Sequence, residues 1–286
     1  MSRIAYVNGR YLPHRTARVH IEDRGYQFAD GIYEVIAVVN RRLLDGEPHF
    51  DRLEHSLAAV RIAAPMSRPA LTAVAVETIR RNRVDEGFLY LQVTRGVAPR
   101  EHAFPAAATP SLVMTARARR FGHDPEALTG GSAVTTRDIR WERCDIKSIA
   151  LLPNVLAKQQ AVEAGAHETL MVDDDGFVTE GSSANAWILD REGRVITRGA
   201  DHAILNGITR QSLIRLARAA GIAVEERPFT VAEAKAAREA FITSTSQWVK
   251  PITEIDGTVI GNGAPGETAR RLFALYLTHA RTACPA

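Results

Sequence analysis

The stretch DIRWERCDIKSIALLPN, residues 138–154, contains one lysine, Lys147, directly before a run of apolar residues. Apolar and β-branched residues of this kind are typical of a chain that enters a hydrophobic core. A lysine in such a place either lays its aliphatic stem on apolar surface and keeps its amine in water, or carries an amine that the fold puts inside. The residues around Lys147, taken alone, leave both possibilities open.

Size and composition are those of an ordinary globular protein. The chain has 286 residues, of which 45% are hydrophobic and 24% charged, and this length suits two domains or one large one. The net charge of +3 is small and the basic doublets are scattered, so we expect no nucleic-acid partner. No apolar run reaches the roughly 20 residues that span a bilayer, so we expect no membrane partner.

Cysteine usage and the N-terminal residues bear on the compartment. Cys144 and Cys284 are the only cysteines, and they form neither a metal-ligand spacing nor a disulfide framework. The sequence MSRIAYVNGRYLP contains no apolar stretch of signal-peptide length. We therefore expect a soluble protein of a reducing cytoplasm.

Strand-like and helix-like segments alternate in the first part of the chain. IAYVNGRYL predicts a hairpin with a tight turn at Asn8-Gly9, and residues 31–44 form a β-rich run with a turn near residues 40–42. Helices are expected from Phe50 onward and over about residues 68–82, and GFLYLQVTRG returns to strand.

The best candidate for a domain boundary is the polar stretch from Ala116 to Gly131, which is punctuated by glycine and proline. It predicts an N-terminal domain over residues 1–118, a linker over 119–130 and a C-terminal domain over 131–286. The fold class is therefore α/β or α+β in two domains.

Beyond the linker the same alternation continues. SAVTTRDI predicts a strand, NVLAKQQAVEAG a helix that ends at Gly165, and ETLMVDDDGFVTE a hairpin that turns at Asp175-Gly176. SANAWILD and RVIT predict strands, and ITRQSLIRLARAAG predicts an amphipathic helix that ends at Gly221. EAFITSTSQWVKPI is strand-like, and a last helix covers about residues 266–281.

Two motifs match known ligand loops, but we expect both to be turns. GNGAPG, residues 261–266, has the glycine spacing of a dinucleotide-binding loop, yet only one helix follows it and the required parallel strand is missing. DDDG, residues 173–176, has Met171 where a calcium loop needs an aspartate. The sequence contains no HExxH pair and no GxSxG elbow, so it predicts neither a metal site nor a serine nucleophile.

Several motifs occur in a fixed order around Lys147. CDIKSIALLPNVLAKQQAVEAGAHE is followed by VTEGSSANAW, NGITRQSL and FITSTS, and is preceded by YVNGRYL, EDRGYQFADGIYEV and VTRGVAPREHAFP. This order resembles the fold-type-IV pyridoxal-phosphate (PLP) aminotransferases, and most closely their bacterial D-amino acid branch. The resemblance implies a smaller N-terminal α/β domain and a larger C-terminal pseudo-barrel domain that binds PLP.

The resemblance assigns the two catalytic roles. An aldehyde cofactor is held by a primary amine, which must be deprotonated to attack; Lys147 matches the family's Schiff-base lysine, and its freed amine would then carry a proton between substrate and cofactor. The cofactor ring nitrogen must stay protonated, which requires a fixed anion, and Glu180 in VTEGSS matches that carboxylate. Ser182 and Ser183 offer hydroxyls to the ring oxygen or to its surroundings.

The phosphate needs positive charge and backbone donors. NGITRQSL opens a helix at Ile208-Thr209, where free N–H groups and the helix dipole favour an anion, although many helix starts bind nothing. The resemblance assigns cofactor binding to residues from several motifs: Arg52, Leu205, Gly207, Ile208, Thr209, Ser244 and Thr245.

The stretch APREHAFP, residues 98–105, contains the residues that bear on the choice of substrate. Arg100 and His102 are two residues apart, so an extended chain would point both the same way, toward one carboxylate. Taken alone, they favour a solvated basic loop. The resemblance makes Arg100, His102 and the Tyr33 hydroxyl a receptor for the substrate α-carboxylate, with the first two supplied by the neighbouring subunit of a homodimer.

The resemblance implies transfer of an amino group from a D-amino acid such as D-alanine to 2-oxoglutarate, which gives a 2-oxo acid and D-glutamate. Branched-chain L-amino acid and (R)-amine transaminases share the fold without the Arg-x-His pair. They are the alternatives, together with a lyase of the aminodeoxychorismate type.

Overall fold

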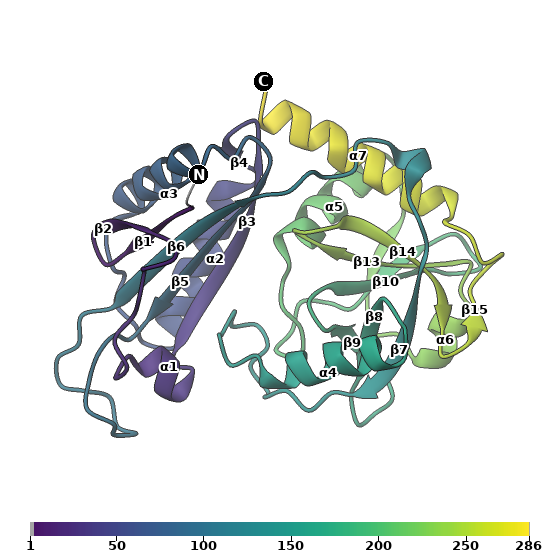
Figure 1. Cartoon of the computed structure of the whole chain (residues 1–286). Coiled ribbons are helices and arrows are strands. Elements are labelled where there is room, and N and C mark those ends of the chain that lie inside the picture. The colour runs from purple at the N-terminus through teal and green to yellow at the C-terminus, as the bar shows by residue number, and fades with distance from the viewer. Residues whose placement is uncertain (1–2, 286) are drawn as a thin grey trace. The chain divides into compact units, whose positions relative to one another are not determined.

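The computed structural model describes residues 3–285, which form two compact units around separate sheets (Figure 1). The first unit contains the chain up to Phe121, the segment Ile146–Ala150 and the last residues from Ala280 onward. The second unit contains Gly122–Asp145 and Leu151–His279. The chain thus passes between units inside the stretch 119–130, but the segment around Lys147 belongs to the first unit.

The first unit is an antiparallel sheet with the strand order β2-β1-β6-β5-β3-β4. Its strands are β1 Ile4–Val7, β2 Arg10–Pro13, β3 Gly31–Val39, β4 Arg42–Leu43, β5 Gly87–Thr94 and β6 Ser111–Ala118. Helices α2, Gly46–Ala59, and α3, Arg68–Asn82, pack on the sheet, and their apolar side chains share one buried core with those of β3, β5 and β6. The short helix α1, Arg24–Phe28, precedes β3.

Local turn chemistry explains the two hairpins of this unit. Asn8 and Gly9 have φ values of 45° and 89° between β1 and β2. Asn40 and Arg41 have φ values of 49° and 64° between β3 and β4, so this turn uses Arg41 and leaves Arg42 in the strand. Two central residues with positive φ are what a two-residue hairpin turn of type I′ requires. Both predicted hairpins are confirmed, as is the helix over 68–82, whereas α2 begins before Phe50.

The second unit is a mixed sheet with the strand order β12-β11-β10-β13-β14-β7-β8-β9, and β15 pairs with β14. Its strands are β7 Gly131–Arg137, β8 Glu168–Val172, β9 Val178–Gly181, β10 Asn185–Leu189, β11 Val195–Thr197, β12 Val224–Glu226, β13 Glu239–Ser244, β14 Trp248–Ile255 and β15 Thr258–Val259. The end strand β9 contacts β10 without pairing with it, so the sheet curls back on itself as a pseudo-barrel does. EAFITSTSQWVKPI therefore contains two strands, β13 and β14, and not one.

Helices α4 Leu152–Glu163, α5 Ile208–Ala219 and α6 Val231–Ala236 belong to the second unit, with a 3-10 turn at Pro125–Ala127, and α7 Glu267–Ala283 belongs to it up to His279. α4 packs on β7 and β8, and α5 on β12 and β13. The acidic stretch DDDG and the glycine-rich GNGAPG form turns, before β9 and α7, as expected. Within residues 3–285, none of the helices has both the length and the apolar character that a membrane span needs.

Candidate active site

Lys147 is fixed in the first unit by its backbone. Its carbonyl accepts a hydrogen bond from the Tyr33 amide at 3.0 Å, and its own amide donates to the Ser56 hydroxyl at 3.3 Å. The next residue, Ser148, forms a bridge to Ile32, so this segment lies along the start of β3. The half-buried lysine places its Nζ 4.3 Å from the centroid of the Tyr33 ring. The amine therefore lies against an aromatic face within the first unit.

Strand β3 also carries a buried carboxylate, that of Glu34, which the sequence analysis missed. Glu34 has no exposed surface, and both its oxygens bind Arg52, from Nε to Oε1 and from Nη2 to Oε2, at 2.7 Å each. His49 Nδ1 also lies 2.7 Å from Oε2. His49, Arg52 and Ser56 come from one face of α2, where residues three and four apart are neighbours.

The surroundings of Glu34 determine its charge. Burial alone would raise the pKa of this carboxyl, but the Arg52 guanidinium and the His49 ring outweigh it and lower the pKa to about 2. Burial lowers the pKa of His49, and the positive charges of Arg52 and Lys147 add to this effect. Glu34 is therefore ionised and fixes the orientation of Arg52, the residue expected to bind phosphate.

Arg100 and His102 come together in the first unit, although not on an extended strand. Both lie in a bent segment and are exposed. The guanidinium carbon of Arg100 lies 4.8 Å from the centroid of the Phe28 ring, and the His102 ring centroid lies 5.4 Å from it. The two side chains thus converge on one aromatic ring, and the bend between them explains why the strict alternation of a strand does not apply.

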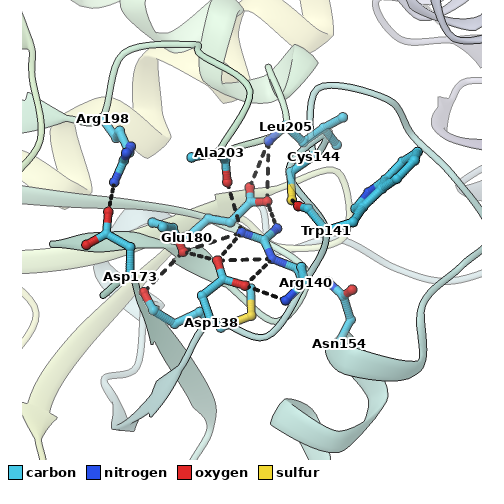
Figure 2. A network of polar contacts seen from close by, with 12 residues as sticks. Asp138, Arg140, Trp141, Cys144, Asn154, Asp173, Glu180, Arg198, Ala203 and Leu205 are labelled. Carbon is cyan, nitrogen blue, oxygen red and sulfur yellow. Dashed lines mark hydrogen bonds and ion pairs between the residues drawn. The ribbon is translucent and has the colours of Figure 1, made fainter. Parts of the chain in front are cut away.

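In the second unit, Glu180 lies at the centre of a polar network (Figure 2). One of its oxygens pairs with Arg140 Nη1, which the sequence analysis also missed, and the other accepts from Asn185 Nδ2 at 3.0 Å. The Leu205 amide lies 3.3 Å from both oxygens. Glu180 is 6% exposed, so these donors compensate a buried negative charge.

Arg140 is itself held by a second carboxylate. Its Nε and Nη2 donate to Asp138 at 2.9 and 2.6 Å, and Nη2 also donates to the Ala203 carbonyl at 3.0 Å (Figure 2). Burial alone would lower the pKa of Arg140, but Asp138 and Glu180 outweigh it and raise the pKa above its ordinary value. This arginine is therefore a permanent cation that holds the Glu180 side chain in place.

Asn185 links Glu180 to the start of α5. Its Nδ2 also donates to the Leu205 carbonyl at 2.8 Å, and a Cβ on Gly207 would lie 2.2 Å from its Oδ1. A side chain at position 207 would therefore have to displace this amide, which two hydrogen bonds hold in place. Gly207 is the N-cap residue of α5 and forms no side-chain capping bond, and Ile208 and Thr209 open the helix. Their amides belong to the first turn, where a helix lacks internal partners and favours an anion.

The remaining expected cofactor residues lie in or near two turns of the second unit. Ser182 is buried, and its hydroxyl donates to Glu168 at 2.5 Å, whereas Ser183 is exposed. Ser244, whose Oγ lies 3.1 Å from that of Ser246, ends β13, and Thr245 follows it in the turn to β14. In this structure the Ser182 hydroxyl therefore interacts with a carboxylate of the protein.

The comparisons with known proteins agree on one family. The amino-transferase class IV family model matches residues 31–255. A protein of Listeria innocua named D-alanine aminotransferase is 40% identical over 280 residues, which cover 97% of this chain and 96% of that protein. A D-alanine aminotransferase of Bacillus licheniformis is 42% identical over 266 residues and 93% of each chain.

The solved structures support the same assignment. The branched-chain amino acid aminotransferase of Thermoproteus uzoniensis, solved with norvaline, has a TM-score of 0.87 at 26% identity, over 99% of this chain and 95% of that one. The family expected from the motif order, and the two-domain fold expected with it, are therefore confirmed. The chain belongs to the class IV aminotransferases.

Proposed function

We propose that this protein is a PLP-dependent D-amino acid aminotransferase, which transfers the amino group of a D-amino acid such as D-alanine to 2-oxoglutarate. The products would be the 2-oxo acid, here pyruvate, and D-glutamate. The observation that carries this proposal is the 40% identity to the Listeria innocua D-alanine aminotransferase over 97% of the chain. The Arg100–His102 pair, a receptor of the right chemistry for an α-carboxylate, supports it.

The donor set suits PLP. Lys147 supplies a primary amine beside an aromatic ring, and Glu180 supplies a buried carboxylate that Arg140 holds in place. The uncapped start of α5 supplies backbone donors for a phosphate, and Gly207 at this N-cap leaves room for the Asn185 amide that binds Glu180. The proposal requires that one bound cofactor meets all three, with Arg52 on its phosphate.

When bound, PLP supplies an electron sink for the charge that develops at the substrate α-carbon. Glu180, whose orientation Arg140 and Asn185 fix, would hold a negative charge beside the ring nitrogen. The Lys147 Nζ would accept the α-proton of the substrate as general base and then donate a proton as general acid. Arg100, His102 and the Tyr33 hydroxyl bind the α-carboxylate, and so determine which hand of the substrate presents its α-hydrogen to Lys147.

We propose a homodimer in which Arg100 and His102 serve the neighbouring subunit. The exposed face of α4 supports an assembly, because Leu152, Val155, Leu156 and Val162 are each more than half exposed there. Mixing K147A and R100A protein through a dissociation step tests the sharing of sites. Random reassociation would restore about a quarter of the wild-type activity from heterodimers with one intact site. Non-shared sites leave the mixture no more active than its two components.

The activity is tested with the purified holoenzyme. We expect a visible absorption band from lysine-bound PLP that D-alanine removes and L-alanine does not. Repeated turnover of D-alanine to pyruvate should require 2-oxoglutarate, because without this acceptor each site can release only one equivalent of pyruvate, and K147A should show no turnover. Catalytic release of pyruvate from aminodeoxychorismate without 2-oxoglutarate, in place of turnover of D-alanine, would identify a lyase, and turnover of L-leucine in place of D-alanine would identify a branched-chain enzyme; either result overturns the proposal.

A further inference from the structure

A buried arginine lies beneath the loop that carries Arg100 and His102. The Arg24 side chain is 3% exposed. Its Nη1 donates to the carbonyl oxygens of Glu101 and Ala103 at 2.5 and 3.4 Å, and its Nη2 donates to the carbonyl of His102 at 3.3 Å. Three successive carbonyl groups of the loop therefore turn toward one guanidinium.

Asp30 orients this guanidinium from the other side. Its Oδ2 accepts from Arg24 Nε at 2.8 Å, and both its oxygens accept from Arg95 at 2.8 and 2.9 Å. Burial alone would raise the pKa of the Asp30 carboxyl, but hydrogen bonds and charge from Arg95 and Arg24 outweigh it and hold the pKa below its ordinary value. Arg24 is thus pinned at Nε, with its two Nη atoms directed at the loop.

The same short helix also contacts the two loop side chains. Arg24 and Phe28 are the first and last residues of α1, four apart, so they lie on one face. The guanidinium carbon of Arg24 lies 4.8 Å from the Phe28 ring centroid, the same distance as that of Arg100, and His102 packs on the same ring. Arg24 thus holds the loop backbone, while Phe28 supports the side chains.

We propose that Arg24 is a positioning residue that presents Arg100 and His102 in the geometry that binds the substrate α-carboxylate. This inference rests on the proposed function of those two residues. A guanidinium suits the task because its donors point in fixed directions within one plane, so one group can bind a carboxylate and several carbonyls at once. A loop that is already ordered loses less conformational freedom when it binds the carboxylate.

The test compares R24K, R24Q, R100Q and the double variant R24K/R100Q as holoenzymes, with D-alanine and 2-oxoglutarate varied in turn. R137Q is the control for R24Q, because it removes the same positive charge. Arg137 is the last residue of β7 and forms an exposed ion pair with Asp174. Each variant is also measured for PLP affinity, for its visible band and for its melting temperature. R24K keeps the charge, so it stays informative where R24Q fails to fold.

We expect R24K to raise the KM of both substrates about 10-fold or more, as the loss of charge-assisted hydrogen bonds implies. We expect kcat at saturation to change less than about threefold, and PLP affinity to be unchanged. R24K/R100Q should have a KM close to that of R100Q, because the two residues act through one receptor. R137Q should behave as wild type.

Three results would overturn the inference. An unchanged KM in R24K shows that the loop needs no such support. If the KM effects of R24K and R100Q add fully in the double variant, Arg24 acts independently of Arg100. A fall in kcat and melting temperature without a rise in KM shows a purely structural role. Failure of the proposed function has a different signature: wild-type protein that does not transaminate D-alanine, or R100Q with a normal KM.

Discussion

Glu34 provides the sharpest test of how the first unit holds its charged residues. The carboxylate is fully buried between Arg52 and His49, and its pKa lies at about 2 against an ordinary 4.5. At about 1.4 kcal/mol per pKa unit, this difference corresponds to about 3 kcal/mol of stabilisation from the ionised form. Removing one member of a buried ion pair costs about 3–5 kcal/mol in general. We therefore expect E34Q to lower the free energy of unfolding by about 3 kcal/mol at pH 7.

The effect should depend on pH with a definite sign. The folded-state pKa lies below the unfolded value, so the stabilisation is complete above pH 4.5 and is lost as the pH falls toward 2. Protonated glutamate and glutamine are alike in charge, so the difference between wild type and E34Q should shrink to about half near pH 3. Urea unfolding followed by circular dichroism at pH 7, 5 and 3 measures it.

E77Q on α3 is the control. Glu77 pairs with Arg80 and Arg81 at the helix surface, where such pairs contribute little, so its replacement should have a much smaller effect. The reasoning is refuted if E34Q unfolds within about 1 kcal/mol of wild type at pH 7, or if its deficit is the same at pH 5 and pH 3.

Two substitutions and one reactivity measurement test the second unit. G207A places a Cβ against the Asn185 amide, so PLP affinity should fall at least about 10-fold by equilibrium dialysis, and an unchanged Kd would contradict the fit at the start of α5. R140Q leaves Glu180 without its cation, so we expect the visible band of the bound cofactor to weaken and kcat to fall by about 10²-fold or more; an unchanged kcat would show that Glu180 does not depend on Arg140. Burial raises the pKa of Cys144 to about 12, so this thiol should react with iodoacetamide at pH 8 far more slowly in folded than in urea-unfolded protein; equal rates would show an accessible thiolate.

Local structure followed from the sequence where neighbouring residues decide it. Asn8-Gly9 accommodates the two positive φ angles of a hairpin, and α3 forms over the predicted residues 68–82. The short elements α1 and α6 and the strands β12 and β15 were missed, because two to six residues carry too little periodicity to recognise. The order of the motifs predicted the family, and with it Lys147 and Glu180 as candidates.

The partners of these candidates could not be predicted. Glu34 is separated from Arg52 by 18 residues and Arg140 from Glu180 by 40, and nothing in either stretch of sequence indicates the other. Arg24 reads as an ordinary charged residue in EDRGYQF, yet it binds the carbonyl groups of a loop 77 to 79 residues away. Lys147 itself, which the sequence left between two interpretations, lies half-buried against Tyr33.

The sequence by itself determined the residue types that the chemistry needs, the turns and longer helices that local conformation dictates, and the family to which the chain belongs. Only the tertiary structure decided which charges meet inside each unit. The reason is physical: a buried charge must find its counter-charge in space, and the packing of a helix on a strand or the curl of a sheet brings together residues whose separation along the chain carries no record of that contact.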